Sequence, residues 1–487
     1  MSANRKITIN PISRIEGHGK VVINLDSDGN VADAKFHVTQ FRGYERFCQG
    51  RPFEEMPSIT QRICGICPVS HQLASAKACD AILGVTIPQT AVMLRRLLHA
   101  GQFIQSHALH FFHLASPDLL LGWDSDPALR NVVGVIGAYP ELAKKGIQLR
   151  KFGQDIIRIL GGKSIHPAFA IPGGVINGLM EKDRDHLLTG FAQAYQTCYA
   201  ALDFIKEWLE KNRHEIGRFA NFTSILTGLV DDAGCPDMYD GKLRIQDWTP
   251  DSRVDIDPSD YLNHIAEHVE SWSYLKFPYI KDKGFPQGCY RVGPLARVTM
   301  ADAMSTSKAQ AELVLYREKT QDGIAGSTLL FHYARLIELM NCLEVAENLL
   351  RASAIIGTDI NNTAPVSNEE GIGVIEAPRG TLFHHYQVDE NDIVTKANLI
   401  VSTTSNNMAM NESVRQVAAE YLSGQELTEP LLNNLEVAIR AYDPCLSCAT
   451  HAIGKMPLQL ELINADGKLI DKLVKGSDGH IDRNLNA

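Results

Sequence analysis

The stretch that decides how this chain must fold is RICGICPVSH, residues 62–71, in which Cys64 and Cys67 form a Cys-x-x-Cys pair with a histidine four residues after the second cysteine. A second pair, Cys445 and Cys448, stands hundreds of residues later in DPCLSCATH and is also followed by a histidine. Thiolates are soft ligands that suit zinc, iron and nickel, and two pairs supply enough donors for a four-sulfur metal site. Such a site requires the two ends of the chain to meet.

The spacing alone leaves several kinds of site open. A zinc knuckle, a thioredoxin-like redox pair and a structural Zn(Cys)4 site all use Cys-x-x-Cys. Zinc ribbons, however, bring their pairs together within about 15–20 residues to staple a local fold, and a chain of this size does not need such a staple. The histidines that follow the pairs, His71 and His451, favour a surrounding shell of polar groups or an additional metal. The single cysteines are expected to be small buried hydrophobic residues: Cys48, Cys79, Cys198, Cys235, Cys289 and Cys342.

Composition restricts the class of protein. The chain has 487 residues, 45% of them hydrophobic and 21% charged, which is typical of a soluble globular protein. The net charge is -10 and no stretch is dense in lysine or arginine, so a nucleic-acid partner is excluded. The first residues contain no apolar run long enough for a secretion signal or a membrane anchor, which predicts a cytoplasmic protein without a membrane span.

The pattern of apolar residues predicts a mainly α (α+β) fold. Residues 1–53 alternate in the manner of strands, around an Asp-Ser-Asp-Gly turn. Most of residues 54–451 is helical, with shorter pieces over 222–305 and a return of strands over 371–404. No linker divides this part, so residues 1–451 are predicted to form one catalytic domain, a central bundle of long helices flanked by small β-sheets. Helices are predicted over 70–84, 90–115, 185–220, 307–319, 331–353, 413–423 and 431–443.

The two cysteine segments resemble the signatures RxCGxCxxxH and DPCxxCxxH of the nickel–iron hydrogenase large subunit. SRIEGHGKV, FRGYERFCQG, GVIEAPRGTLFHH and ANLIVSTTSNN follow the order seen in that family, so the resemblance covers essentially the whole chain. EAPRGTLFHHY, AIRAYDPCLSCATHAIGKMP and WSYLKFPY are most similar to the soluble, bidirectional NAD-linked class. The resemblance implies the large-subunit fold and the reversible, heterolytic cleavage of H2, with the hydride between two metals and the proton on a nearby base.

The resemblance also implies roles for individual residues. All four cysteines would bind nickel, and Cys67 and Cys448 would bridge to an iron that carries carbon monoxide and cyanide. Glu16 matches a glutamate that relays protons; the alternative is a surface carboxylate at a strand end. Arg379 matches an arginine over the open metal positions, where its permanent charge suits electrostatic positioning. The alternative for Arg379 is a salt bridge with Glu376.

Around the diatomic ligands, Pro378, Arg379 and Thr403 match the pocket that supplies hydrogen bonds to cyanide. Asp443 is expected to hold Arg379 or to bond around the cluster. Ser402 stands where many relatives carry proline, which makes the pocket slightly more polar.

A magnesium site nearby is implied at Glu45, His451 and the main-chain carbonyl near Leu399. Oxygen donors suit magnesium, although a lone imidazole is unusual for it. His71 is expected to lie close to the metal-bound group.

Two other patterns are weaker. His107, His110 and His113 recur at three-residue spacing without an acidic neighbour, which predicts ordinary buried or hydrogen-bonding histidines; a relay role for one of them is the alternative. GIGVIE, residues 371–376, begins like a dinucleotide loop, but a glutamate takes the place of the third glycine, so we reject a nucleotide site.

The remaining cysteines do not form an iron–sulfur ligand set, so electrons would leave through a small subunit that carries iron–sulfur clusters. A diaphorase with flavin would then pass them to NAD. The alternatives are NADP- or F420-linked hydrogenases, a non-enzymatic Zn(Cys)4 scaffold and a quinone-reductase subunit; the last is disfavoured because those relatives have lost these cysteines.

Residues 452–487 alternate like a hairpin. By the same resemblance they form a C-terminal extension that an endopeptidase removes after nickel chaperones have loaded the site, and that holds the second cysteine pair away from the first until then.

Overall fold

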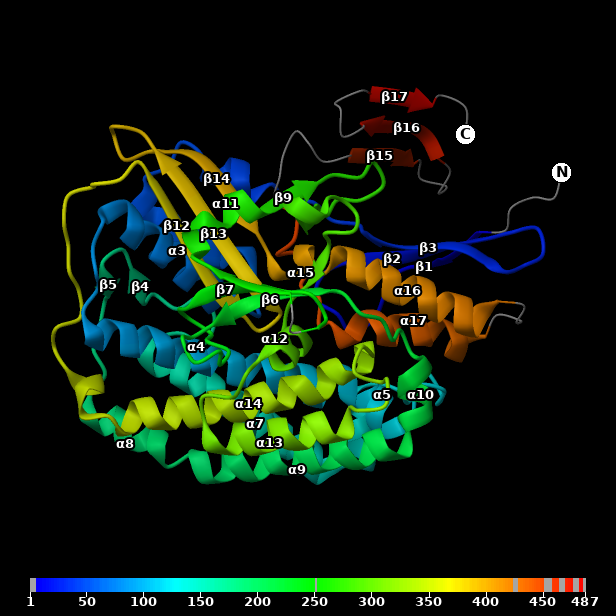
Figure 1. Cartoon of the computed structure of the whole chain (residues 1–487), viewed down its shortest axis with the longest axis horizontal. Helices are drawn as coiled ribbons and strands as arrows, with labels where there is room; N and C mark the ends of the chain where they lie inside the picture. Colours follow the sequence, from blue (N-terminus) through cyan, green and yellow to red (C-terminus); the bar gives the residue numbers. More distant parts are fainter. Residues whose placement is uncertain are drawn as a thin grey trace.

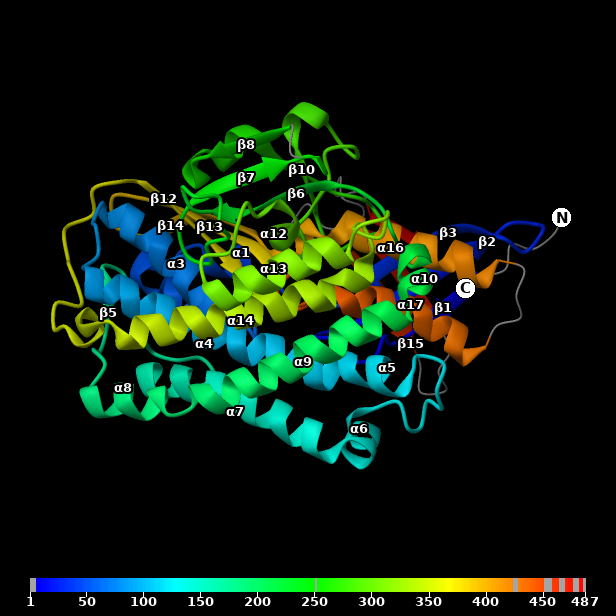
Figure 2. The same ribbon diagram turned by 60° about the horizontal axis from the view of Figure 1, so that its bottom comes forward.

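The computed structural model describes residues 6–249, 252–423 and 428–450, together with three strands beyond them (Figure 1). Long helices lie side by side in one layer, and small sheets cover one side of it (Figures 1 and 2). The predicted class, mainly α with a helix bundle and flanking sheets, is confirmed. The long helices are α3 (Pro68–Leu83), α4 (Gln89–Leu109), α7 (Pro140–Gly161), α9 (Phe191–Lys211), α13 (Ser307–Lys319), α14 (Phe331–Arg351), α16 (Asn407–Leu422) and α17 (Glu429–Ala441).

Burial separates central from outer helices. In α3 all residues except Lys77 and Ala81 are buried, because this helix has neighbours on every side. In α7 the buried residues recur at three-and-four spacing, as expected of a helix with one face in solvent. The sequence analysis missed α7, since its internal Gly146 and Gly153 and its many charged residues weaken the pattern. The single helix predicted over 185–220 is divided into α8 (Glu181–Leu188), α9 and α10 (Arg213–Arg218).

Short helices and small sheets complete the fold. The short helices are α1 (Tyr44–Cys48), α2 (Met56–Thr60), α5 (Ser116–Leu121), α6 (Val132–Ala138), α11 (Tyr261–His264), α12 (Pro294–Met300) and α15 (Ser402–Ser405). The N-terminal antiparallel sheet contains β1 (Lys6–Ile9), β2 (Gly19–Leu25) and β3 (Val31–Val38), and a second contains β12 (Glu370–Ala377), β13 (Gly380–Val388) and β14 (Val394–Ile400). The middle of the chain adds β4 (Ala170–Ile171) with β5 (Gly174–Val175), β9 (Ile265–His268) with β10 (Phe277–Ile280), and a sheet in the order β11 (Tyr290–Arg291), β6 (Ile225–Val230), β7 (Lys242–Gln246), β8 (Arg253–Ile256).

The glycines of GIGVIE have a packing role. A Cβ on Gly373 would lie 2.0 Å from the carbonyl oxygen of Ala74, and one on Gly371 would lie 2.1 Å from that of Ala78. Only glycine lets β12 approach α3 this closely. The contact holds α3, which begins directly after Cys67, against the strand that leads to Arg379.

The ends of the chain share one core. The largest buried apolar cluster contains residues from Ile9 to Ala449, so the two cysteine segments belong to one packed unit. Beyond it, β15 (Leu458–Ile463), β16 (Leu469–Lys475) and β17 (Ile481–Asn484) form an antiparallel sheet, which confirms the predicted hairpin and adds a strand. Within the described residues, no helix has the length and apolarity that a membrane crossing requires.

Candidate metal centre

Two loops present the four cysteines. Cys64 follows a short 3-10 turn, and Cys67 is the last residue before α3, whose first residue is the proline that helix starts favour. The second pair follows the end of α17, where Asp443 turns the chain with a left-handed φ of 55°. Both pairs therefore lie at helix ends, where the backbone is irregular and side chains can converge.

The four sulfurs form one compact group. All lie within 4.8 Å of one another and all are buried. The Sγ–Sγ distances are 3.3 Å for Cys64–Cys445, 3.6 Å for Cys67–Cys448 and 2.7 Å for Cys445–Cys448. Metal–thiolate bonds of about 2.3 Å hold neighbouring sulfurs roughly 3–4 Å apart, so the arrangement fits a shared metal. Within the described part of the chain, no other group of His, Cys, Asp and Glu side chains gathers in this way.

The protonation of the group favours metal capture. Hydrogen bonds from Cys445, Cys448 and Cys67 lower the pKa of Cys64 well below its ordinary value, and the backbone N–H groups of Ile66 and Cys67 also donate to its sulfur at 3.2 and 3.3 Å. Burial, followed by the neighbouring sulfurs, raises the pKa values of Cys445 and Cys448. Bringing thiols that resist ionisation next to one thiolate is costly without a cation, so a soft metal that displaces their protons would stabilise the site.

Arg379 is fixed beside the sulfurs by Asp443. Its Nε donates to the Asp443 carbonyl at 2.5 Å and one terminal nitrogen donates to Asp443 Oδ1 at 3.1 Å. The other terminal nitrogen, Nη1, is buried and has no partner among the residues described. Glu376, the alternative partner from the sequence analysis, is bonded to Arg297 instead. Arg379 therefore retains one unused donor.

A small cavity opens beside the sulfurs. It is lined by Cys67, Cys445, Cys448, Ser70, His71, Ala377, Arg379, Leu382, Val401, Ser402 and Thr403. Thr403 Oγ accepts a hydrogen bond from the Cys445 N–H at 2.9 Å, and Ser402 Oγ donates to the Gly380 carbonyl at 2.6 Å. Pro378 is buried next to this cavity but is not among its lining residues; its carbonyl accepts from Arg297 at 3.3 Å. The unused Arg379 donor and the Thr403 hydroxyl are suited to a group that accepts hydrogen bonds.

His71 belongs to a buried chain of hydrogen bonds that sequence analysis missed. His71 Nδ1 lies 3.1 Å from His384 Nε2, and His384 Nδ1 lies 2.6 Å from the Tyr386 hydroxyl, which bonds Ser75 Oγ at 3.0 Å. Burial lowers the pKa of His71 to about 4, so this ring is neutral at ordinary pH. The adjacent HHY of GTLFHHY was a signal, since alternate residues of a strand share one face.

Glu16 lies on the second cysteine loop. Its carbonyl accepts from the Leu446 N–H at 3.1 Å, and its carboxylate accepts from the backbone N–H of Ser447 at 3.1 Å and from the Ser447 hydroxyl. A Cβ on Gly17, which has a φ of +87°, would lie 2.7 Å from the Leu446 Cβ, so the motif Glu-Gly-His requires its glycine for this approach. The carboxylate is thus bound between the two cysteines of the pair, in place of the strand-end surface position that was the alternative.

Glu45 lies in a second polar site. Its Oε1 accepts from the Leu399 N–H at 3.1 Å and from Lys276 Nζ at 3.3 Å. Leu399 therefore meets Glu45 through its amide, whereas the expectation was its carbonyl oxygen. Lys276 also bonds Glu267 at 2.9 Å, and the second carboxylate oxygen of Glu267 is buried without a partner in the described structure. His451 lies outside the described residues.

The three histidines of α4 and the segment after it are held by ordinary bonds where partners are seen. His107 donates to Glu338 at 3.0 Å, an acidic partner from α14 that the local sequence did not reveal, and His110 donates to the Arg440 carbonyl at 2.8 Å. The second pair already lies against the first in a chain that carries residues 452–487. The expectation that this extension holds the pair apart is therefore wrong for this structure.

Comparison with known proteins agrees with this geometry. A family described as nickel-dependent hydrogenase matches residues 42–121 and 238–451, and one described as HoxL-like matches residues 6–41. The chain therefore belongs to the nickel-dependent hydrogenase family, as a large subunit of the nickel–iron type. It is 45% identical over 485 residues to the NAD-reducing hydrogenase HoxS subunit beta of Cupriavidus necator, covering 96% of this chain and 99% of that protein.

Two further relatives extend the match. One polypeptide of the F420-non-reducing hydrogenase of Methanothermobacter thermautotrophicus is 43% identical over 476 residues, covering 96% of this chain and 100% of that protein. The crystal structure of an NAD+-reducing [NiFe]-hydrogenase in the H2-reduced state superposes with a TM-score of 0.89 at 47% identity, over 92% of this chain and 99% of that chain. The fold expected from the resemblance is confirmed, and the chain is a hydrogenase.

Proposed function

We propose that this chain is the catalytic subunit of a cytoplasmic, NAD-linked hydrogenase that cleaves H2 reversibly. Electrons would pass through a small subunit with iron–sulfur clusters and a flavin-containing diaphorase to NAD+. The observation that carries the proposal is the group of four buried sulfurs drawn from two distant motifs. The NAD link rests on relatives named as NAD-reducing, and NADP or F420 as acceptor is the alternative.

Nickel would be held by Cys64, Cys67, Cys445 and Cys448, and iron with carbon monoxide and cyanide by Cys67 and Cys448 as bridges. The donor set fits, because soft thiolates suit both metals and the adjacent cavity offers hydrogen-bond donors from Arg379 and Thr403. When bound, this group supplies the site at which the H–H bond is polarised and split into hydride and proton.

The side chains around the sulfurs would handle charge and protons. Arg379 adds a fixed positive charge to the wall of the cavity, and its bonds to Asp443 hold the guanidinium in place without consuming all its donors. Glu16 is a carboxylate bound to the loop that carries Cys445 and Cys448, which suits it to accept the proton and pass it toward solvent.

A magnesium ion at Glu45 is a further part of the proposal. The unpartnered, buried oxygen of Glu267 indicates that this site lacks a positive group, since Lys276 satisfies only one of its two oxygens. Glu45, the imidazole of His451 and the main chain at Leu399 would hold the ion, with oxygen donors as magnesium prefers.

Metal analysis of the purified multi-subunit complex tests the proposal. We expect nickel and iron in equal amounts, infrared bands of bound carbon monoxide and cyanide, and H2-dependent reduction of NAD+ in preference to NADP+. Zinc alone, without H2-dependent dye reduction, would instead identify a Zn(Cys)4 scaffold. Preference for NADP+ or F420 would move the chain to the alternative class.

The proton role of Glu16 predicts a selective loss. In the complex with Glu16→Gln, exchange between D2 and solvent protons should fall at least about 100-fold, because an amide cannot carry the proton. Interconversion of para- and ortho-H2 should persist, since it requires cleavage at the metals but no proton export. Glu370→Gln, which changes a carboxylate bonded to His385, is the control and should leave both rates as in wild type. Unchanged solvent exchange in Glu16→Gln would refute the relay.

We propose, finally, that residues 1–451 form the mature catalytic domain and that an endopeptidase removes residues 452–487 after nickel chaperones have acted. The solved relative supports this, since 92% of this chain accounts for 99% of that one and leaves a share similar in size to the extension. Intact-mass measurement of the active complex should find a chain that ends at His451. An active enzyme that retains Ala487 would contradict the proposal.

A further inference from the structure

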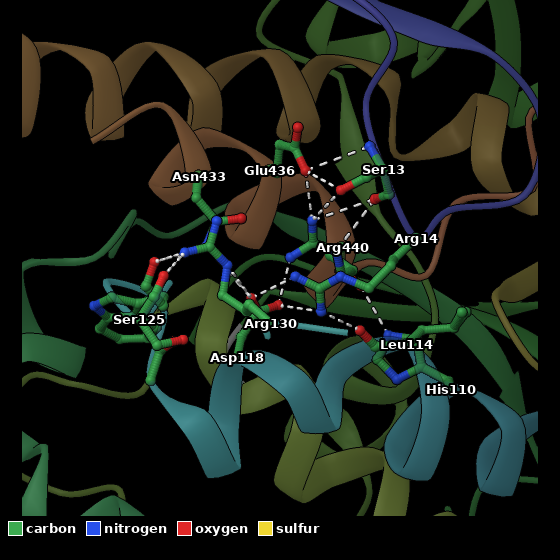
Figure 3. Close-up of polar contacts among 12 residues, drawn as sticks. Ser13, Arg14, His110, Leu114, Asp118, Ser125, Arg130, Asn433, Glu436 and Arg440 are labelled. Atoms are coloured by element: carbon green, nitrogen blue, oxygen red, sulfur yellow. Dashed lines mark hydrogen bonds and ion pairs between the residues drawn. The ribbon is translucent and has the colours of Figure 1, made fainter. Parts of the chain in front are cut away.

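A buried ion cluster lies directly behind the Glu16 segment (Figure 3). Arg14, two residues before Glu16, binds both oxygens of Asp118 at 2.6 and 2.9 Å and donates to the Leu114 carbonyl at 2.7 Å. Asp118 belongs to α5, and its side chain is almost completely buried. The planar guanidinium fork therefore ties the N-terminal segment to the helical bundle by three hydrogen bonds.

Arg440 ties the second cysteine segment to the same carboxylate. It donates to Asp118 Oδ2, and its other nitrogens contact the Ser13 carbonyl at 3.2 Å and Glu436 at 2.7 Å. Arg440 stands in the last turn of α17, close before Asp443 and Cys445. Asp118 thus joins the two segments that carry the relay carboxylate and the second cysteine pair (Figure 3).

The electrostatics make the cluster rigid. Burial alone would raise the pKa of Asp118, but the guanidiniums of Arg440 and Arg14 outweigh burial and lower the pKa below its ordinary value. Asp118 is therefore ionised, and its bonds are charge-assisted. Removing either arginine would leave a buried charge with fewer partners, which is costly.

The backbone of Arg14 is strained in a way that this cluster explains. Its φ is 55°, a left-handed conformation that a non-glycine residue adopts at a cost of about 1–3 kcal/mol. Such a conformation persists only where surrounding contacts fix it, and here the three bonds of the guanidinium do so. A single residue separates Arg14 from Glu16, so a change in the backbone at one is passed to the other.

We propose that Arg14 is a positioning residue that, through Asp118, places the Glu16 carboxylate on the second cysteine loop. The inference rests on the proposed relay role of Glu16. Displacing a proton-transfer group by about 1 Å costs up to about 100-fold in rate. Loss of the Arg14 fork should therefore slow proton export while the metals and H2 cleavage remain.

The chain offers a matched control in Arg130. This arginine also lies beside Asp118, with Nε 3.9 Å from Oδ1, but its bonds go to Glu429 and to the carbonyls of Trp123 and Ser125 at 2.9 and 2.7 Å. It makes no contact with Ser13 or Arg14 among the bonds that the structure describes. Arg130→Gln therefore removes a buried arginine from the same cluster without releasing the Glu16 segment.

The experiment measures D2–solvent exchange relative to para/ortho conversion in the assembled complex. In Arg14→Gln we expect this ratio to fall about 10- to 100-fold with nickel content unchanged. Arg14→Lys should restore part of it, because lysine keeps the charge but not the fork. Arg130→Gln should lower the melting temperature and leave the ratio as in wild type.

The outcomes separate this inference from the relay itself. If Glu16→Gln leaves exchange intact, the relay role fails. If Glu16→Gln blocks exchange but Arg14→Gln leaves the ratio unchanged, or lowers it no more than Arg130→Gln does, the positioning role alone is wrong. Should Arg14→Gln fail to assemble, Arg14→Lys decides, and a wild-type ratio in that variant overturns the inference.

Discussion

Replacing Cys67 with serine should abolish H2 oxidation and leave the complex without bound nickel. The hydroxyl of serine remains protonated near neutral pH and is a hard donor, whereas the other three ligands are soft thiolates. Cys67 lies 3.6 Å from Cys448 and lines the cavity, so its loss also removes one of the two expected bridges to iron. Loss of several kcal/mol of transition-state stabilisation lowers the rate by at least about 1,000-fold.

The chain supplies its own control for this variant. Cys198 is equally buried, but it lies in α9 and its nearest polar contact is the Leu336 carbonyl at 3.9 Å. Cys198→Ser should cost some stability and keep both nickel and activity. Elemental analysis and H2-dependent dye reduction on the two purified complexes make the comparison. Nickel retained in Cys67→Ser at the wild-type ratio would show that the four sulfurs are not the nickel site.

The cysteine site could be predicted because its signal is local and chemically specific. Each Cys-x-x-Cys pair can be read within ten residues, and only the 381-residue separation between Cys64 and Cys445 had to be supplied by the fold. The helices with strong apolar spacing were found for the same reason. Helix α7 was missed, since glycines occupy positions where apolar side chains would have shown its buried face.

The supporting groups could not be predicted from local patterns. Lys276 and Glu267 reach Glu45 from β10 and β9, and Glu338 reaches His107 from α14. The Asp118 cluster combines residues from the N-terminal segment, α5 and α17. Each residue alone looks like an ordinary surface charge in the sequence, because an ion pair between distant segments leaves no periodic pattern in either of them.

Arg379→Lys should retain nickel but lower kcat by about 100- to 1,000-fold. Arginine makes two contacts with Asp443 and keeps Nη1 unpaired in the same pocket as Cys67, Cys445 and Cys448. Lysine carries the same charge, but its single ammonium cannot bond Asp443 and still present a fixed donor to the cavity. Losing one preorganised donor at a buried site typically costs about 2.7–4 kcal/mol of transition-state stabilisation.

The competing explanation is that any buried arginine would be equally sensitive to this exchange. Arg95 tests it, since its guanidinium also binds a carboxylate, Asp80, at 2.6 and 3.3 Å and donates to backbone carbonyls, yet it does not line the cavity. Arg95→Lys should lower the melting temperature with kcat nearly unchanged. Measurement of kcat, nickel content and the infrared bands on both variants separates the two explanations. Equal losses of kcat in both would mean that Arg379 acts only through packing, and a wild-type kcat in Arg379→Lys would show that its charge alone is sufficient.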